Sequence, residues 1–216
     1  METTATIFST WSHNGQKQLR RIGLAAIVIL WLAAVLVGIA AMMDYEFSSG
    51  EDPRAPALWP TDSGISRTAG HPTVLVFAHP RCPCTEATLD ELAEIVAATD
   101  AGADIKVLFF RPGNAGADWT QSRSVSRTAA MPDVQIISDE NGREAQLFHA
   151  VTSGRTLLYD AAGHLLFDGG ITGSRGHAGE NAGSKAVREL LTQGSHIRST
   201  TPVFGCSILE NDTQCD

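Results

Sequence analysis

The sequence predicts an α/β domain with a central mixed sheet flanked by helices, preceded by one transmembrane helix near the N-terminus. Three observations lead to this fold class. An uncharged apolar run covers residues 22–43, and strand-like and helix-like segments alternate from residue 73 onwards. Two cysteines, in Cys82-Pro83-Cys84, lie between the first such strand and the first such helix. Alternation of this kind is typical of one α/β core.

The apolar run 22–43 is predicted to be a membrane anchor. At about 1.5 Å per helical residue it spans roughly 33 Å, which is enough to cross the hydrocarbon layer of a bilayer. A cleaved signal peptide has a shorter apolar segment followed by small residues. Ala40-Ala41 loosely resembles such a cleavage site, so cleavage is the alternative.

Flanking charges predict the orientation of this anchor. Lys17, Arg20 and Arg21 precede it, whereas acidic residues follow it closely. Positive flanks stay in the cytoplasm, so residues 1–21 should form a cytoplasmic tail and the rest should be periplasmic or otherwise extracytoplasmic. Residues 44–216 hold 23 acidic and 13 basic residues, a formal charge of −10, which argues against nucleic acid as a partner.

The extracytoplasmic part divides by composition into three segments. Residues 44–72 are rich in Pro, Ser, Gly and Asp and are predicted to be an extended linker. Residues 73–195 are predicted to be the folded domain, and residues 196–216 a tail that contains two cysteines.

The elements of the domain follow from hydrophobic periodicity and from turn residues. Continuous apolar runs predict buried strands, helical spacing predicts amphipathic helices, and Asp160-Ala161-Ala162-Gly163 predicts a hairpin turn. The predicted strands are 74–78, 105–110, 134–137, 155–159 and 164–167, and the predicted helices are a segment through 89–96 that ends near residue 102, then 117–130, 144–150 and 185–191.

Cys82 and Cys84 are the candidate catalytic residues. A strand that feeds two cysteines into the first turn of a helix places them where backbone N–H groups and the helix dipole favour thiolate over thiol. Such thiolates exchange disulfides readily, and they also bind soft metal ions. A disulfide across a single residue closes a strained ring, so this pair should be easily reduced.

Three further side chains are candidates to line this site. His79 precedes Cys82 by three residues, where it could lower the thiol pKa or complete a metal site. Arg81 could favour the thiolate by its charge. His177 lies in a Gly-rich stretch. Its glycines either allow the backbone to approach another group closely or form a flexible loop. Each of the three could equally be an ordinary surface residue.

Cys206 and Cys215 have two possible roles. In an oxidising compartment four cysteines suggest two disulfides, or one catalytic pair and one structural bond. A structural Cys206–Cys215 disulfide is the simpler prediction. The alternative is that Cys206 reaches Cys82 and Cys84 as a resolving thiol or, with His79, as part of a metal site for copper or zinc.

The order of elements and the motif resemble the thioredoxin-like superfamily, particularly the membrane-anchored TlpA- and ResA-type thiol-disulfide proteins. The resemblance covers roughly residues 70–192. It rests on Val74-Leu75-Val76-Phe77-Ala78-His79-Pro80-Arg81-Cys82 and on Thr156-Leu157-Leu158-Tyr159-Asp160. It implies that Pro80 lines the site. The whole chain also resembles RedB-type membrane proteins, through 79–84, 176–179 and 201–206.

Two departures from the superfamily pattern matter. The family spaces its cysteines by two residues, whereas one separates them here, and Gly154-Arg155 occupies the place of the usual cis-proline. The missing proline removes bulk that would keep a metal away from the thiols. The arginine resembles that of peroxiredoxin-like members, which implies that Arg155 lines the site.

Three functions therefore remain open. The resemblance implies thiol-disulfide exchange on the thiols and disulfides of exported proteins, without a cofactor. A copper- or zinc-binding protein, with Cys82, Cys84, His79 and Cys206 as ligands, is one alternative, and a thiol peroxidase is the other. The sequence contains no motif for a hydrolase.

Overall fold

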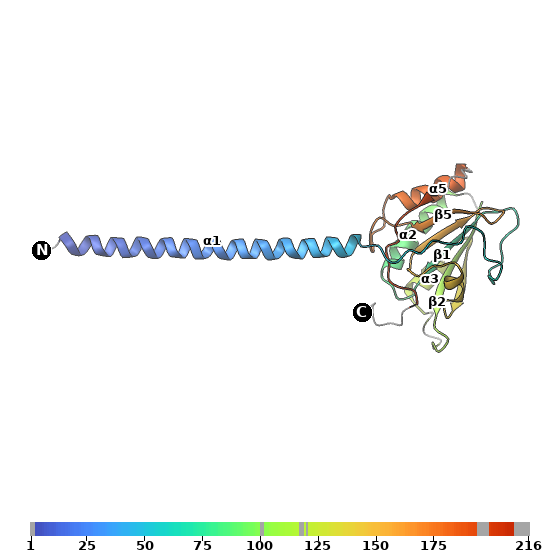
Figure 1. The fold of residues 1–216 in the computed structure, drawn as a ribbon, viewed down its shortest axis with the longest axis horizontal. Helices are drawn as coiled ribbons and strands as arrows, with labels where there is room; N and C mark the ends of the chain where they lie inside the picture. The colour runs from blue at the N-terminus through green and yellow to red at the C-terminus, as the bar shows by residue number, and fades with distance from the viewer. Residues whose placement is uncertain (1–2, 100–101, 117–118, 120, 194–198, 210–216) are drawn as a thin grey trace. The chain divides into compact units, whose positions relative to one another are not determined.

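The computed structural model of the protein describes residues 3–99, 102–116, 119, 121–193 and 199–209, and for residues 3–16 the backbone alone (Figure 1). The chain forms two compact units, Met1–Tyr45 and Glu46–Asp216. The first is made by helix α1 (Thr3–Phe47), in which Lys17–Phe47 is long and apolar enough to cross a membrane.

The second unit contains a six-stranded mixed sheet with the strand order β3-β2-β1-β4-β5-β6. Strands β1, β2 and β3 are parallel, whereas β4 is antiparallel to both β1 and β5, and β6 is parallel to β5. The strands are β1 (Thr73–Ala78), β2 (Asp104–Arg111), β3 (Val134–Glu140), β4 (Arg155–Tyr159), β5 (Leu165–Gly170) and β6 (Ser199–Thr200).

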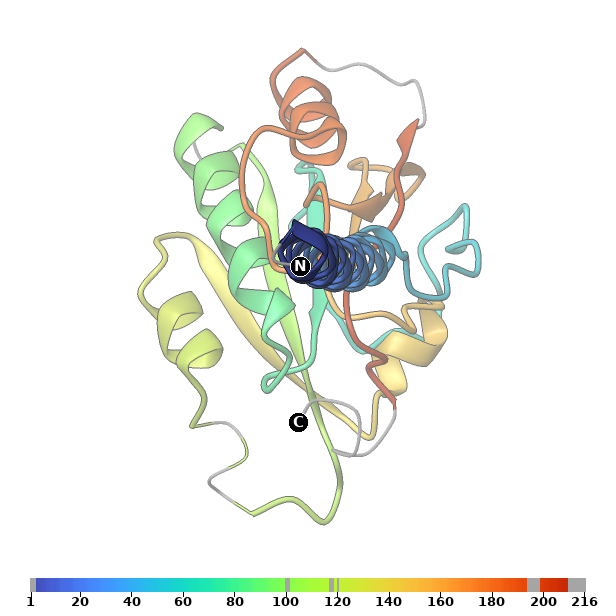
Figure 2. The same cartoon turned by 90° about the vertical axis from the view of Figure 1, so that its left-hand side faces the viewer.

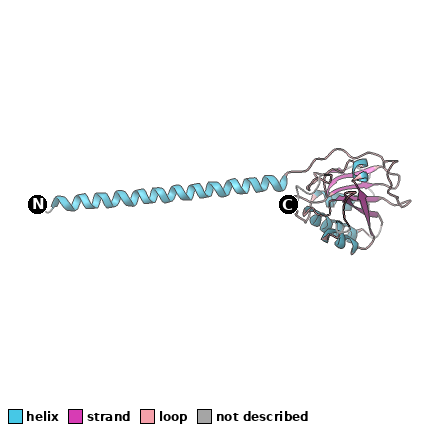
Figure 3. Ribbon diagram, turned by 90° about the horizontal axis from the view of Figure 1, so that it is seen from below, coloured by secondary structure: helices cyan, strands magenta, loops and turns pink. Residues whose placement is uncertain are grey.

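Helices cover both faces of this sheet (Figure 3). They are α2 (Cys84–Ala98), α3 (Arg123–Ala129), α4 (Arg143–Leu147) and α5 (Ala182–Gln193). Alternate residues of β1 feed two cores: Val74 and Val76 pack with α2 and α5, whereas Leu75 and Phe77 pack with Phe148. Figure 2 shows α2 beside α5, which it contacts. β1 is buried along its whole length, which explains its unbroken apolar sequence.

Residues 48–72 differ from the predicted extended linker, because they pack against the domain. Ala55 and Ile65 are buried, and the ring of Trp59 meets the ring of Phe148 edge-on, with 5.0 Å between the centroids. The backbone N–H of Ala55 donates to Asp168, which belongs to β5. The proline-rich composition excluded regular elements here, but it did not reveal these long-range contacts.

The other elements lie close to their predicted positions. Helix α3 is shorter than the predicted 117–130, of which residues 117, 118 and 120 lie outside the described part of the chain. Strand β3 continues beyond residue 137, since polar residues up to Glu140 keep their pairing with β2. The 199–209 segment, predicted to be part of a tail, supplies β6 and then crosses toward the start of α2.

Candidate functional site

The candidate site lies where β1 ends and α2 begins. After Ala78 the chain makes a tight turn, in which the N–H of Cys82 donates to the carbonyl of His79 at 3.1 Å. Pro83 occupies the N-cap position and Cys84 is the first residue of α2. Both cysteines therefore lie at a helix N-terminus, where the positive end of the helix dipole stabilises a thiolate.

Cys206 completes a group of three reduced cysteines at this position. Its Sγ lies 3.0 Å from the Sγ of Cys82, although 124 residues separate the two in the chain. The segment that carries Cys206 is fixed by backbone hydrogen bonds at 2.8 Å, from Ser153 N to the Cys206 carbonyl and from Ile208 N to the Val151 carbonyl. The third thiol is thus built into the domain.

Contacts among the three thiols lower the pKa of Cys82 and raise the pKa of Cys84. The pKa of Cys82 is held well below that of an ordinary thiol, mainly by a hydrogen bond from Cys206 and then by one from Cys84. A hydrogen bond with Cys206 lowers the pKa of Cys84, but the hydrogen bond that Cys84 gives to Cys82, its burial and the Cys82 charge together raise it. Of the two motif cysteines, Cys82 is therefore the one on which a thiolate is favoured.

Attack on a substrate from the start of α2 would require the two motif sulfurs to be reachable by solvent, but the structure buries both side chains. Cys82 is 2 % exposed and Cys84 is 7 % exposed, whereas Cys206 is half-buried. The backbone bonds of Ser153 and Ile208 hold the Cys206 segment against this region. The approach of Cys206 to this site was one of two alternatives that the sequence left open, because the segment reaches the site only through long-range pairing.

His79 and Arg81 lie close to the Cys82-Pro83-Cys84 motif in the chain, but the side chains of both contact aromatic rings. The ring of buried His79 stacks on Phe110 and meets Trp119 edge-on, with 5.8 Å and 5.7 Å between the centroids. The guanidinium of Arg81 lies over the Trp119 ring at 4.2 Å. Pro80 is buried between them in the chain. These contacts fix the turn that carries Cys82.

Arg155 takes the backbone position that the resemblance implied, since it is the residue of β4 that pairs with Phe77 near the end of β1. Its side chain, however, has other partners. Its fully buried guanidinium donates to Asp168 at 2.5 Å and forms an ion pair with Asp52 at 2.7 Å. A buried cation requires such acidic partners. The prediction that Arg155 serves the thiols is thus corrected to a role in joining β4, β5 and the 48–72 segment.

Gly154 stands where the superfamily has its cis-proline, and the described residues contain no cis peptide. Its φ of +92° favours glycine, and its N–H donates to the Phe77 carbonyl at 2.8 Å. A Cβ at this position would press on the Thr88 hydroxyl at 2.9 Å. The glycine therefore closes the backbone against β1 and α2 without adding bulk beside the cysteines.

His177 is exposed, and its Nδ1 lies 3.2 Å from the Ser174 hydroxyl and 2.8 Å from the Arg175 carbonyl. Its neighbour Arg175 was not among the predicted site residues. Arg175 donates to the Gly205 carbonyl at 2.7 Å, and its charge lowers the pKa of Cys84. The Gly-rich stretch is evident in the sequence, but no local pattern indicates that Arg175 reaches residue 205.

Ser153 is a second residue that sequence analysis missed. Its hydroxyl accepts a hydrogen bond from His79 N at 2.9 Å and lies 3.1 Å from the hydroxyl of Thr85. Its own N–H binds the carbonyl of Cys206. One serine thus connects the turn before Cys82, the first turn of α2 and the third cysteine.

Cys215 lies outside the described residues, so its predicted disulfide with Cys206 stays a prediction. In the described part of the chain, no group of three or more His, Cys, Asp or Glu has the arrangement of a metal site. Binding of copper or zinc by Cys82, Cys84, Cys206 and His79 likewise stays a prediction.

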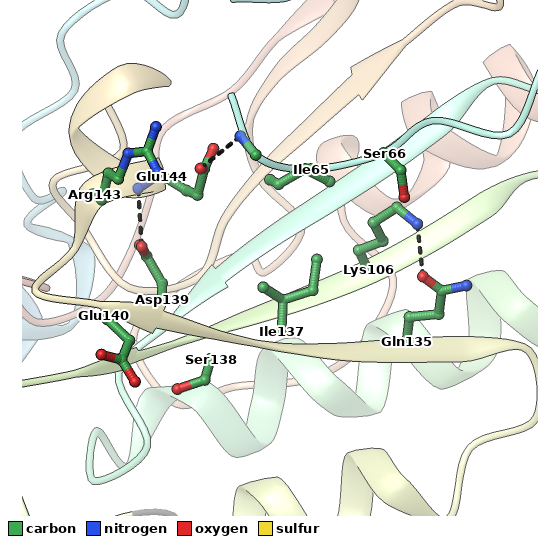
Figure 4. Close-up of a pocket in the computed structure, with 11 residues that line it drawn as sticks. Ile65, Ser66, Lys106, Gln135, Ile137, Ser138, Asp139, Glu140, Arg143 and Glu144 are labelled. Carbon is green, nitrogen blue, oxygen red and sulfur yellow. Dashed lines mark hydrogen bonds between the residues drawn. The ribbon is translucent and has the colours of Figure 1, made fainter. Parts of the chain in front are cut away.

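A polar pocket lies away from the cysteines, between β3, the start of α4 and residues 64–66 (Figure 4). Several of its polar groups already have partners. Lys106 donates to Gln135 at 2.7 Å, and the N–H of Glu144 donates to Asp139 at 2.8 Å. None of the three described cysteines lines this pocket, so it is separate from the candidate site.

No family model matches the chain, and no curated protein matches it. Among solved structures, an uncharacterized conserved protein from Geobacillus kaustophilus aligns over 77 % of this chain and 94 % of its own, with a TM-score of 0.56 and 18 % identity. A hypothetical protein from Sinorhizobium meliloti aligns over 77 % of this chain and 96 % of its own, with a TM-score of 0.56 and 16 % identity. These similarities concern the fold.

The strand order identifies the fold. A parallel β1–β2 pair beside an antiparallel β4–β5 pair, with paired cysteines at the junction of β1 and α2 and a helix layer on each face, is the arrangement that the sequence resemblance implied. The domain therefore has a thioredoxin-like fold.

Proposed function

We propose that the protein is a membrane-anchored thiol-disulfide oxidoreductase that acts on the thiols and disulfides of exported proteins. The observation that carries this proposal is the 3.0 Å contact between the Sγ of Cys82, directly before helix α2, and the Sγ of Cys206. Hydrogen bonds with Cys206 and Cys84 lower the pKa of Cys82, which supports the same proposal. A thiolate beside a second thiol is the chemical requirement for disulfide exchange, since the first attacks or leaves and the second takes its place.

The anchor and its orientation belong to the same proposal. Helix α1 contains an apolar segment of sufficient length, and positive charges precede that segment. In this orientation the catalytic domain lies in an oxidising compartment, where exported proteins acquire and exchange their disulfides.

The test is an exchange assay with the full chain in detergent. A reduced, unfolded protein substrate with several cysteines is incubated with the oxidised protein, and the loss of substrate thiols is followed over time. The wild-type chain should accelerate their oxidation, and Cys82→Ser should reduce the rate to background because the stabilised sulfur is lost. Equal rates for the two chains would contradict the proposal.

Two controls separate the alternative functions. Metal analysis of the purified chain should show less than one copper or zinc ion per chain, since stoichiometric metal would indicate a binding protein. Peroxide should be consumed no faster than by Cys82→Ser. The structure gives the peroxidase little support, because the guanidinium of Arg155 binds Asp52 and Asp168.

A further inference from the structure

We propose that the oxidised protein contains a Cys82–Cys206 disulfide, rather than a bond within the Cys82-Pro83-Cys84 motif, and that Cys206 is the sulfur that substrate thiols attack. The identity of the pair stands on geometry alone, whereas the role of Cys206 toward substrates rests on the proposed function. The proposal changes which residues form the redox couple, since Cys84 becomes a positioning residue.

Distance favours this pair. The sulfurs of Cys82 and Cys206 are 3.0 Å apart, and a disulfide has a length of about 2.05 Å, so a shift of about 1 Å would allow the bond to form. A bond between Cys82 and Cys84 would close a ring over a single intervening residue, which disulfide geometry accommodates poorly. The third cysteine thus offers Cys82 a partner that comes from a different part of the chain.

The fold holds Cys206 at this distance. Residues 206–208 lie along residues 151–153, through the Ser153 and Ile208 backbone bonds and an antiparallel bridge between Thr152 and Ser207. Gly205 packs so tightly on the carbonyl of Ser153 that a Cβ there would collide with it. Such close contacts are a sign of a built arrangement, because a loosely attached tail would leave room for a side chain.

Access to solvent assigns the direction of attack. Of the three sulfur-bearing residues, Cys206 alone is half-buried, whereas Cys82 and Cys84 are nearly inaccessible. A substrate thiolate therefore reaches Cys206 first. It attacks the Sγ of Cys206, a substrate–Cys206 bond forms, and the Cys82–Cys206 bond breaks with its electron pair left on Cys82.

The second step completes the exchange. Another substrate thiolate attacks the substrate sulfur of the mixed disulfide, a substrate disulfide forms, and Cys206 leaves as a thiolate that takes up a proton. Two substrate thiols are oxidised and the Cys82–Cys206 disulfide is reduced, so atoms and electrons balance. Cys82 suits the role of first leaving group, because a thiol with a low pKa leaves faster. Cys84 stabilises the departing sulfur by its hydrogen bond.

Disulfide mapping of the full chain in detergent tests the pair. The protein is reduced, oxidised with glutathione disulfide, alkylated under denaturing conditions, digested and analysed by mass spectrometry. We expect a Cys82–Cys206 cross-linked peptide and an alkylated Cys84, the same result for Cys215→Ser, and the same cross-link in Cys84→Ser. A predominant Cys82–Cys84 or Cys206–Cys215 bond would overturn the proposal.

The trapped intermediate tests the role of Cys206. In Cys82→Ser the resolving sulfur is missing, so glutathione should accumulate stoichiometrically on Cys206, whereas the wild-type chain should retain little of it. Accumulation on Cys84 would overturn the assignment. Circular dichroism of each variant checks that it folds. The double variant Cys82→Ser/Cys206→Ala should lose this adduct, which gives a second measurement of the same point.

This experiment is independent of the proposed function, since it uses glutathione disulfide alone. If the cross-link forms but no protein substrate is oxidised, the proposed function fails and the pairing stands. If substrates are oxidised through a Cys82–Cys84 bond, the function stands and the pairing fails.

Discussion

The charge on Cys82 depends on two hydrogen bonds from other thiols. The bond from Cys206 contributes most and the bond from Cys84 contributes next, while burial opposes both. Each partner can therefore be removed separately, and the acidity of the remaining thiolate reports its contribution.

We predict that Cys206→Ser and Cys84→Ser both change the thiolate titration of the reduced protein. Wild-type Cys82 should stay ionised at mildly acidic pH, because its pKa lies far below the ordinary thiol value of about 8.5. The apparent pKa should rise in both variants, and more in Cys206→Ser. The measurement is the pH dependence of the ultraviolet absorbance of the thiolate, which needs no access to the buried sulfur, with Cys215→Ser as the control; an unchanged titration in Cys206→Ser would contradict the assignment.

The same shift predicts a pH dependence of stability. The pKa of the Cys82 thiol is lower in the folded than in the unfolded chain, so the folded chain loses the thiol proton at a lower pH. The free energy of unfolding therefore rises with pH up to the ordinary thiol pKa. The contribution is lost as pH falls through the folded pKa. Reduced wild-type protein should therefore gain stability over Cys82→Ser between pH 5 and about pH 8 in urea unfolding. An equal pH slope for the two chains would argue against a thiolate.

Arg155 supplies a stability prediction at the same scale. Its buried guanidinium neutralises Asp168, whose side chain is itself buried, so Arg155→Met should cost about 3–5 kcal/mol of unfolding free energy. Arg155→Met combined with Asp168→Leu should recover part of this loss, since the buried carboxylate of Asp168 is then removed together with its cation and only the more exposed Asp52 loses its partner. Arg111→Met is the control: its pair with Glu140 is largely exposed and should contribute at most about 1 kcal/mol. Similar losses for Arg155→Met and Arg111→Met would be evidence against the buried network.

Among the elements, the segment 199–209 matters most for the site. It extends the sheet at β6, passes Gly205 across the Ser153 carbonyl and ends by pairing with residues 151–153. Arg175 from the Gly-rich stretch binds the Gly205 carbonyl at 2.7 Å and holds the same segment from another direction.

We predict that Gly205→Ala releases this segment. The added Cβ has no space beside Ser153, so the unfolding free energy should fall by about 1–3 kcal/mol and Cys82 should become more reactive toward maleimide. Gly173→Ala is the matched control, since its nearest neighbour lies at an ordinary 3.6 Å. Equal reactivity of Cys82 toward maleimide in the two variants would mean that residues 199–209 do not cover this cysteine.

The elements also show what the sequence could and could not predict. Strands β1 and β2 and helix α2 follow from local patterns, because unbroken apolar runs and helical spacing report burial directly. The docking of 48–72 and 199–209 depends on partners such as Asp168 and Ser153, which lie far away in the chain and carry no local signal. Arg155 illustrates the limit: its backbone position was predicted, but the direction of its side chain was set by Asp52 and Asp168.

For the whole molecule, the two compact units lead to a prediction about membrane sidedness. Residues 46–216 form a unit with its own two cores, and α1 holds the apolar segment. In membrane vesicles with the cytoplasmic face inside, added protease should digest this unit, and in inverted vesicles the unit should be protected. Replacing Lys17, Arg20 and Arg21 by Glu should reduce this asymmetry, because the positive flank is removed. Protection in the opposite vesicles would reverse the proposed orientation.

The separation of 124 residues between Cys82 and Cys206 has a consequence for biosynthesis. While the chain is being made, Cys82 emerges long before the thiol that contributes most to its ionisation, so the nascent polypeptide carries only an ordinary, weakly reactive sulfur. Its full nucleophilicity arises only after the late segment has docked. This order of synthesis shortens the time during which a reactive Cys82 could pair with the cysteines of other unfolded chains.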